Sequence, residues 1–197
     1  MSTKIIFVRH EETQKDSNLP ASSWGLSTNG FDNAQKLADN DLLLDANIIY
    51  TSSEIKTFQT IKPLAEKLNL KITQLSELDE VRRGDKFLTN EEFENEKFRQ
   101  LEDLDYPAFG GETAREALTR FEKAIERIEN ENSFHGNSDK QIIVVSHGTI
   151  LNLYFSQIQN DFSNIKKRWL NTKFGAIGIL KDGIVIKDIT NIQETYP

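Results

Sequence analysis

Two short apolar runs stand out from the pattern of hydrophobic and polar positions along the chain. Residues 5–8 read Ile-Ile-Phe-Val, and residues 142–145 read Ile-Ile-Val-Val. Continuous, mostly β-branched runs of this length are typical of strands that are buried on both faces, as in a parallel sheet. The first run leads into Arg9-His10 and the second into Ser146-His147-Gly148. Because ligands bind at the carboxyl ends of the strands in an open α/β sheet, we expect both histidines to lie in a functional site.

Apolar residues at helical spacing predict helices between these strands and after them. We expect one helix after residues 27–28, one after the Thr-Ser-Ser sequence at residues 51–53, one at the capping box Thr113-x-x-Glu116, and one after the second histidine. Pro63 should kink or interrupt the second of these helices. The first should bury a stripe of apolar side chains: Phe31, Ala34, Leu37, Ala38 and Leu42.

Further strands are predicted on either side of the two central runs. Residues 48–50 form a short apolar run, and residues 70–75 alternate between apolar and polar. Near the C-terminus, residues 174–180 and 184–189 are separated by Lys-Asp-Gly, a strong signal for a hairpin. We therefore predict an α/β fold, a three-layer α/β/α sandwich with a mostly parallel central sheet and an antiparallel edge near the C-terminus. Residues 1–197 are expected to form a single domain.

The segment from residue 76 to residue 111 is rich in charge and irregular in pattern. A capping box at residues 89–92 predicts a helix that ends at residues 107–111. We expect an excursion over the carboxyl edge of the sheet, which is either a lid over the active site or a solvated helix without a role. Its basic residues could contact a second negative charge on a substrate or be ordinary surface charges: Arg82, Arg83, Lys86 and Arg99.

Composition excludes several classes of protein. The 197 residues carry a net charge of −7, so nucleic acid and anionic membranes are not expected partners. The chain has no cysteine, which excludes disulfides and thiolate chemistry. It has neither an apolar run long enough for a membrane span nor a signal peptide at its start, so a cytoplasmic location is expected. Two histidines without a spaced ligand cluster argue against a metal hydrolase. Nothing in the sequence indicates the oligomeric state.

The residues at the two strand ends suit phosphoryl transfer. This reaction needs a nucleophile, cations around the phosphoryl oxygens and a proton for the leaving oxygen. His10 can attack phosphorus, Arg9 supplies a planar fork suited to phosphate, and His147 can donate to the phosphoryl oxygens. Backbone N–H groups at the start of the following helix can also face an anion. The proton donor is left open by this reasoning among three carboxyl groups: Glu77, Glu80 and Glu112.

Several segments, in order along residues 4 to about 155, resemble motifs of one family. The chain resembles the histidine phosphatase superfamily, the phosphoglycerate mutase-like group. The matching segments are residues 9–13 (Arg-His-Glu-Glu-Thr), 26–30 with Ala34, Ser52 with Gln59-Thr60, 78–80 with Gly84, 110–113 with Arg120, and 146–148. A single Arg-His pair is weak support, but these motifs in family order are specific.

The resemblance implies a role for each matching residue. It implies that His10 is the phosphohistidine nucleophile, that Arg9 and His147 bind the phosphoryl group, and that Glu80 is the general acid and then the base. Lys56 stands where the family usually has a second phosphate-binding arginine. The expected activity is hydrolysis of a small phosphorylated metabolite, a phosphomonoester, without cofactor or metal.

The sequence departs from the family pattern at three positions. Glu11 replaces a glycine, Asp16 stands where an asparagine often helps to hold phosphate, and Lys56 keeps the charge of an arginine but loses its fork. Each departure weakens anion binding, which keeps open a phosphate-binding or interaction protein with weakened catalysis. A phosphoglycerate mutase-like phosphotransferase is the other alternative, although residues 81–85 do not reproduce the mutase motifs.

Overall fold

The two apolar runs form adjacent central strands of one sheet in the computed structural model, which describes residues 3–84, 88–133 and 140–190. Strand β1 (Thr3–Arg9) pairs in parallel with β4 (Lys140–Ser146), and this register places Arg9 opposite Ser146. The six strands are ordered β3-β2-β4-β1-β5-β6. Both histidines therefore follow the carboxyl ends of neighbouring parallel strands.

The remaining strands extend the sheet in both directions. On one side, β2 (Ile48–Thr51) and β3 (Ile72–Gln74) continue the parallel part. On the other side, β5 (Ile177–Lys181) runs antiparallel to β1, and β6 (Ile184–Lys187) runs antiparallel to β5. The predicted parallel sheet and antiparallel edge are confirmed. The hairpin turn holds Asp182 and Gly183 at φ 52° and 76°, as the Asp-Gly pair predicted.

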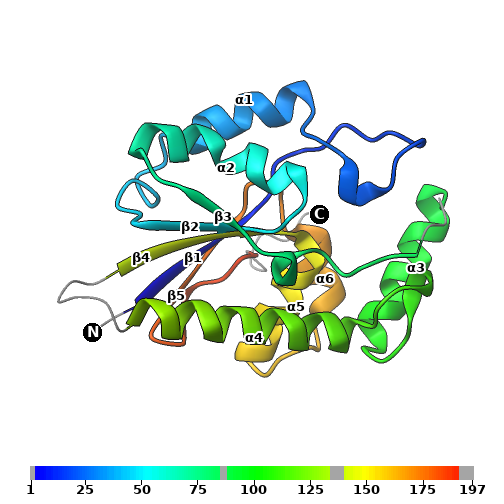
Figure 1. Ribbon diagram of the computed structural model, residues 1–197. Coiled ribbons are helices and arrows are strands. Elements are labelled where there is room, and N and C mark those ends of the chain that lie inside the picture. Colours follow the sequence, from blue (N-terminus) through cyan, green and yellow to red (C-terminus); the bar gives the residue numbers. More distant parts are fainter. Residues whose placement is uncertain (1–2, 85–87, 134–139, 191–197) are drawn as a thin grey trace.

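Alternate side chains of β1 enter two hydrophobic cores, one on each face of the sheet. Ile5 and Phe7 pack with α4 (Ala114–Ser133) and α5 (Gly148–Ile158). Ile6 and Val8 lie in the second core, which α1 (Thr28–Leu37) and α2 (Ile55–Leu68) cover. Figure 1 shows α1 and α2 above the sheet and α4 and α5 below it, so the three-layer prediction is confirmed.

Capping residues predicted where the helices begin more accurately than apolar spacing predicted which side chains are buried. Ser27 caps α1 by accepting from the Gly30 N–H, as predicted. Phe31 and Leu42 are 46% and 37% exposed, so the prediction that both are buried is wrong. The helix ends at Leu37, which leaves Leu42 in the following turn, and Phe31 lies on the outer side of the helix.

Other bounds also differ from the predicted ones. The N-cap of α2 is Glu54 and not the Thr-Ser-Ser sequence, because β2 still includes Thr51. The helix is continuous through Pro63. Strand β3 is shorter than the predicted one, and β5 begins only at Ile177, so Phe174 lies before it in a loop. A short helix α6 (Ile165–Asn171) was not predicted, since its single turn of apolar spacing is weak.

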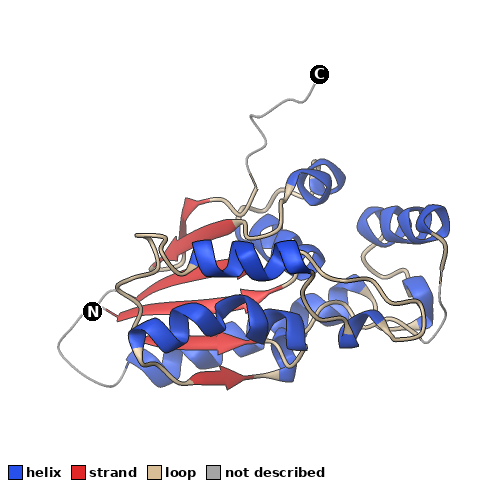
Figure 2. Ribbon diagram, turned by 90° about the horizontal axis from the view of Figure 1, so that it is seen from above, coloured by secondary structure: helices blue, strands red, loops and turns tan. Residues whose placement is uncertain are grey.

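The charged excursion forms a helix set apart from the sheet. Helix α3 (Asn90–Glu102) begins with the predicted capping box between Thr89 and Glu92, but it ends before residues 107–111. Short 3₁₀ turns η2 (Ser76–Leu78) and η3 (Ala108–Gly110) flank it, and another, η1 (Ala21–Ser23), lies in the loop after β1. Figures 1 and 2 show α3 beyond the ends toward which the parallel strands point.

Among the described residues, no helix combines the length and the apolar character needed to cross a bilayer. The loop that carries His135 lies outside the described residues.

Candidate active site

The two motif histidines meet at the carboxyl edge of the sheet. Their ring centroids are 5.1 Å apart, and the backbone N–H of His10 donates to the Ser146 carbonyl at 3.0 Å. Both side chains are buried, with 8% exposed for His10 and 1% for His147. The structure thus brings together the two residues that the strand pattern singled out.

One ring nitrogen of His10 is already engaged. Its Nδ1 lies 2.7 Å from the Glu11 carbonyl oxygen. A carbonyl can only accept, so Nδ1 carries the proton and Nε2 keeps its lone pair. Burial, followed by the charges of His147 and Arg9, holds the pKa of His10 well below its ordinary value. His10 is therefore a neutral imidazole whose Nε2 is suited to nucleophilic attack.

Arg9 is fixed by the segment that precedes β5. Its Nη1 donates to the Thr172 carbonyl, and its guanidinium stacks on Phe174, with Cζ 4.3 Å from the ring centroid. Phe174 also lies against the His10 ring, at 5.6 Å between centroids. The buried Nε of Arg9 has no hydrogen-bond partner among the described residues. Arg9 thus offers an unused donor next to the nucleophile.

His147 faces a polar wall formed by the loop after β2. Its Nε2 is 2.8 Å from Ser52 Oγ and 3.5 Å from Glu54 Oε1. Ser52 Oγ is in turn hydrogen-bonded to Thr57 Oγ1 at 2.9 Å. Burial is the largest cause that lowers the pKa of His147 to about 3, so this ring is neutral as well.

Lys56 lies near the histidines, as its alignment with the second family arginine implied. Its side chain is buried, and its charge acts on both His10 and His147. However, its Nζ donates to the Ala21 carbonyl at 2.6 Å and pairs with Glu54 Oε2 at 2.5 Å. The second cation of the site is therefore present but paired with a carboxylate.

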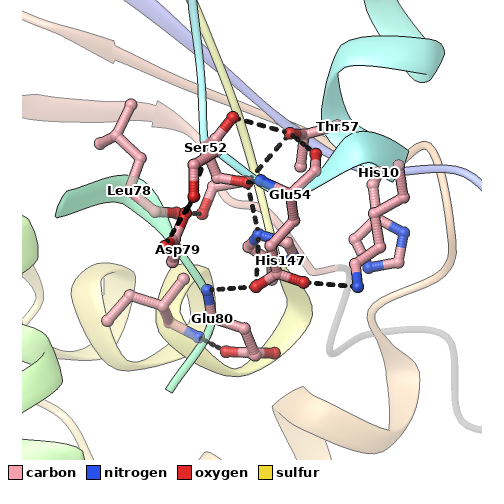
Figure 3. A network of polar contacts seen from close by, with 12 residues as sticks. His10, Ser52, Glu54, Thr57, Leu78, Asp79, Glu80 and His147 are labelled. Carbon is pink, nitrogen blue, oxygen red and sulfur yellow. Dashed lines mark hydrogen bonds and ion pairs between the residues drawn. The ribbon is translucent and has the colours of Figure 1, made fainter. Parts of the chain in front are cut away.

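Glu54 is a buried carboxylate that the sequence reasoning missed. Figure 3 shows its carboxylate pointing toward the His147 ring and the backbone at Glu80, whose N–H donates to Oε1 at 3.2 Å. Burial raises the pKa of Glu54, while the nearby Lys56 opposes the rise. One signal could have found it: Glu54 follows the carboxyl end of a parallel strand, two residues before Lys56.

Glu80 is held at the start of α5. Its two carboxylate oxygens accept from the Thr149 and Ile150 N–H groups, both at 3.0 Å, and from its neighbour Val81 at 3.0 Å. Desolvation would raise the pKa of Glu80, but the charge of Lys97 and the hydrogen bond from the Thr149 N–H lower it below its ordinary value. The helix start thus faces an anion, as predicted, but that anion is the protein's own Glu80.

The other two carboxyl candidates are engaged elsewhere. Glu77 pairs with Arg127 at 3.0 Å. Glu112 pairs with Arg120, whose guanidinium also donates to the carbonyls of residues 77, 79 and 80. These contacts brace the segment that carries Glu80, and Ser146 Oγ ties the same segment to β4 through the Leu78 carbonyl at 2.7 Å. The geometry therefore favours Glu80 among the three.

Two cations of the excursion, Lys97 and Arg83, lie close enough to Glu80 for their charges to act on it. Lys97 is fully buried and donates to Gln100 Oε1 at 2.7 Å, and its Nζ is 5.1 Å from the Phe109 ring centroid. The guanidinium of Arg83 lies over Phe93, with Cζ 4.5 Å from the ring centroid. Both carry charges that act on Glu80. By contrast, Arg82 is exposed, Arg99 is an exposed partner of Glu96, and Lys86 lies outside the described residues.

At two of the three departures from the family pattern, the described side-chain contacts are with groups other than the two histidines. The Glu11 carboxylate lies against Gly175, where a Cβ would come within 2.1 Å of Oε1. The Asp16 carboxylate accepts from the backbone and side chain of Asn18 within its own loop. Lys56 lies in the site, and the charge of Glu11 also acts on Arg9. No group of three or more possible metal ligands occurs in the part of the chain that the structure describes.

Sequence comparison identifies one family. The model of the histidine phosphatase superfamily, branch 1, matches residues 5–191. No curated protein sequence matches the chain.

Solved structures share the fold at low sequence identity. A mycobacterial glucosyl-3-phosphoglycerate phosphatase is 16% identical, with a TM-score of 0.78 over 97% of this chain and 100% of the other. YhfR of Bacillus stearothermophilus is 20% identical, with a TM-score of 0.76 over 94% and 95%. A mutant phosphoserine phosphatase of Entamoeba histolytica, in complex with phosphoserine, is 18% identical, with a TM-score of 0.74 over 97% and 98%. At these identities the likeness concerns the fold.

Proposed function

The chain belongs to the histidine phosphatase superfamily, and on this premise we propose that it hydrolyses a small phosphomonoester through a phosphohistidine on His10. One observation carries the proposal. His10 presents a free Nε2 beside Arg9 and His147, at the ends of two adjacent parallel strands. A neutral, oriented imidazole next to an unused guanidinium donor is the arrangement that attack on a phosphoryl group requires.

In the first step, His10 Nε2 attacks phosphorus and the P–O bond to the leaving group breaks. Arg9 and His147 hold the phosphoryl oxygens as charge moves onto them, and Lys56 adds a second positive charge nearby. Because Nδ1 already donates to the Glu11 carbonyl, the imidazole keeps its orientation during attack. In the second step, water attacks the phosphohistidine and releases inorganic phosphate.

Glu80 is proposed to move the proton in both steps. With its pKa below the ordinary range, it is ionised in the empty site, which is the state that a base for the second step needs. To act as an acid in the first step, it has to take up a proton after the substrate binds. A phosphoryl dianion close to the carboxylate favours this, because like charges raise a carboxyl pKa.

Helix α3 is proposed to act as the cover of the site and not as a solvated helix without a role. Its Lys97 side chain is fully buried, and the charge of Lys97 acts on Glu80. A helix without a role would keep its one lysine in water, because burying a lone ammonium is unfavourable. The cytoplasmic location stays a prediction.

The second candidate is a phosphate-binding protein with weakened catalysis, favoured by the pairing of Lys56 with Glu54. Steady-state hydrolysis of p-nitrophenyl phosphate and of a panel of phosphorylated metabolites separates the two. We expect turnover that His10→Ala abolishes, while His135→Ala, which changes the one histidine outside both motifs, keeps it. A protein that binds inorganic phosphate but hydrolyses no member of the panel would support the binder instead.

A further inference from the structure

The Glu54 carboxylate uses the same groups that a phosphoryl anion needs. Oε2 pairs with Lys56 Nζ at 2.5 Å. Oε1 lies 3.5 Å from His147 Nε2 and accepts from the Glu80 N–H at 3.2 Å. An ammonium and a backbone amide that converge on one carboxylate, beside the His147 ring, form an anion-binding site that is filled from within.

This contact is not an ordinary helix cap. Glu54 is the N-cap residue of α2, yet its side chain makes no capping hydrogen bond to that helix. It reaches instead across the site to the segment of Glu80, with only 9% of the residue exposed. A buried carboxylate is unfavourable unless it is paired, and here the pairing partner is the cation that the substrate would need.

We propose that Glu54 is a built-in competitor of the phosphoryl group, which a substrate has to displace or find protonated before Lys56 and His147 can hold its phosphate. The inference rests on the proposed function. It adds a residue that sets phosphate affinity in this chain, and it makes that affinity depend on pH through Glu54. Removing the Glu54 charge frees Lys56 and takes one negative charge away from the incoming dianion.

The charged surroundings set the direction of the pH effect. Burial favours the neutral form of Glu54, so its competition with phosphate should weaken as the pH falls. The charged and titratable groups that act on Glu54 come from α2, from the start of α5 and from the segment after η2: Lys56, His147, Asp79, Glu80 and Arg83. An entering phosphate adds two negative charges to this set and should draw a proton onto Glu54.

The test compares inorganic phosphate binding in the wild type and in Glu54→Gln from pH 5 to pH 8. The titration of phosphate itself cancels in the ratio of the two dissociation constants at each pH. We expect Glu54→Gln to bind phosphate about tenfold or more tightly at pH 8, and the ratio of the two dissociation constants to fall toward one as the pH is lowered. Calorimetry in two buffers of different ionisation enthalpy should show that the wild type takes up more protons per phosphate than Glu54→Gln.

Asp79→Asn is the matched control. Asp79 is also a partly buried carboxylate close to Glu54, but it accepts from Ser53 and touches neither Lys56 nor His147 in the described contacts. We expect its phosphate affinity to stay within a factor of about two of the wild type. An equal gain in phosphate affinity in Asp79→Asn and Glu54→Gln would indicate a general charge effect. It would overturn the proposal that Glu54 competes with phosphate.

Other outcomes are equally decisive. Equal phosphate affinity of wild type and Glu54→Gln at every pH would overturn the inference and leave the proposed function standing. Absence of phosphate binding and of turnover in both proteins would remove the proposed function and the inference together. If Glu54→Gln does not fold, Glu54→Leu, an apolar residue for a buried position, replaces it.

Discussion

Replacing Gly148 with alanine should impair phosphate binding without harming the fold. Gly148 is the first residue of α5, and its φ is not positive, so alanine adopts the same backbone without strain. A Cβ at this position would lie 3.0 Å from both Cζ and Nε of Arg9. This is closer than an ordinary carbon contact of about 3.5–4.0 Å, so the guanidinium has to give way by a few tenths of an ångström.

The guanidinium cannot move freely, because Arg9 also donates to the Thr172 carbonyl and stacks on Phe174. A displacement of about 1 Å in a positioning group can reduce catalysis by about 10²-fold. We therefore expect the smaller displacement in Gly148→Ala to lower kcat/KM by about 3- to 10-fold, which corresponds to roughly 1 kcal/mol of transition-state stabilisation. The free energy of unfolding should stay within about 1 kcal/mol of the wild type, since alanine is the better helix former.

Gly178→Ala should show the opposite pattern, a loss of stability without a loss of activity. Its Cβ would lie 2.4 Å from Cζ of Phe155 in the core, away from Arg9. Overpacking of this kind lowers the free energy of unfolding by about 1–3 kcal/mol and should leave kcat/KM unchanged. Initial rates with p-nitrophenyl phosphate and urea unfolding curves measure both quantities. Wild-type kcat/KM in Gly148→Ala would show that the Arg9 guanidinium does not hold the phosphoryl group.

Two further predictions concern Glu80 and His147. Glu80→Gln keeps the shape of the side chain and removes its proton, so phosphorylation by an alkyl phosphate should slow by about 10² to 10⁴, and phosphorylation by p-nitrophenyl phosphate much less. Equal losses for both substrates in rapid-quench bursts would exclude Glu80 as the acid. Burial lowers the pKa of His147 to about 3. Below its ordinary pKa of about 6.5, the unfolded chain binds a proton that the folded one does not, so stability falls as the pH falls. Between pH 6.5 and pH 5 the free energy of unfolding should fall by about 1.5–2 kcal/mol more in the wild type than in His147→Gln. Equal falls in the two proteins, measured by urea unfolding, would contradict this burial.

The parts of the fold that could be predicted depend on neighbouring residues. Continuous apolar runs located β1 and β4, an Asp-Gly pair located the hairpin before β6, and the Thr89 and Thr113 capping boxes located the starts of α3 and α4. The burial of single side chains was predicted less well. Phe31 followed the apolar spacing and still lies outside the core, because the short α1 needs only a narrow stripe to cover the sheet.

The apolar pattern predicted the two histidines of the candidate site, because each of them follows a central strand. His10 and His147 meet because β1 and β4 are neighbours in register. The contact of Arg9 with Thr172, 163 residues away, depends on how the chain returns to β5. The position of Glu54 beside His147 depends on the pairing of β2 with β4, which no local pattern encodes. Contacts that depend on how the strands pair could therefore be identified only in the structure.

The central claim is the covalent intermediate on His10, and trapping it is the most direct test. Wild-type protein mixed with p-nitrophenyl phosphate and quenched in base within milliseconds should carry one acid-labile, base-stable phosphoryl group. Peptide mapping should place it on His10, and NMR of the phosphopeptide should place it on Nε2, because Nδ1 is held by the Glu11 carbonyl. Turnover without a phosphoenzyme, or a phosphoryl group on Nδ1 or on another residue, would contradict the account.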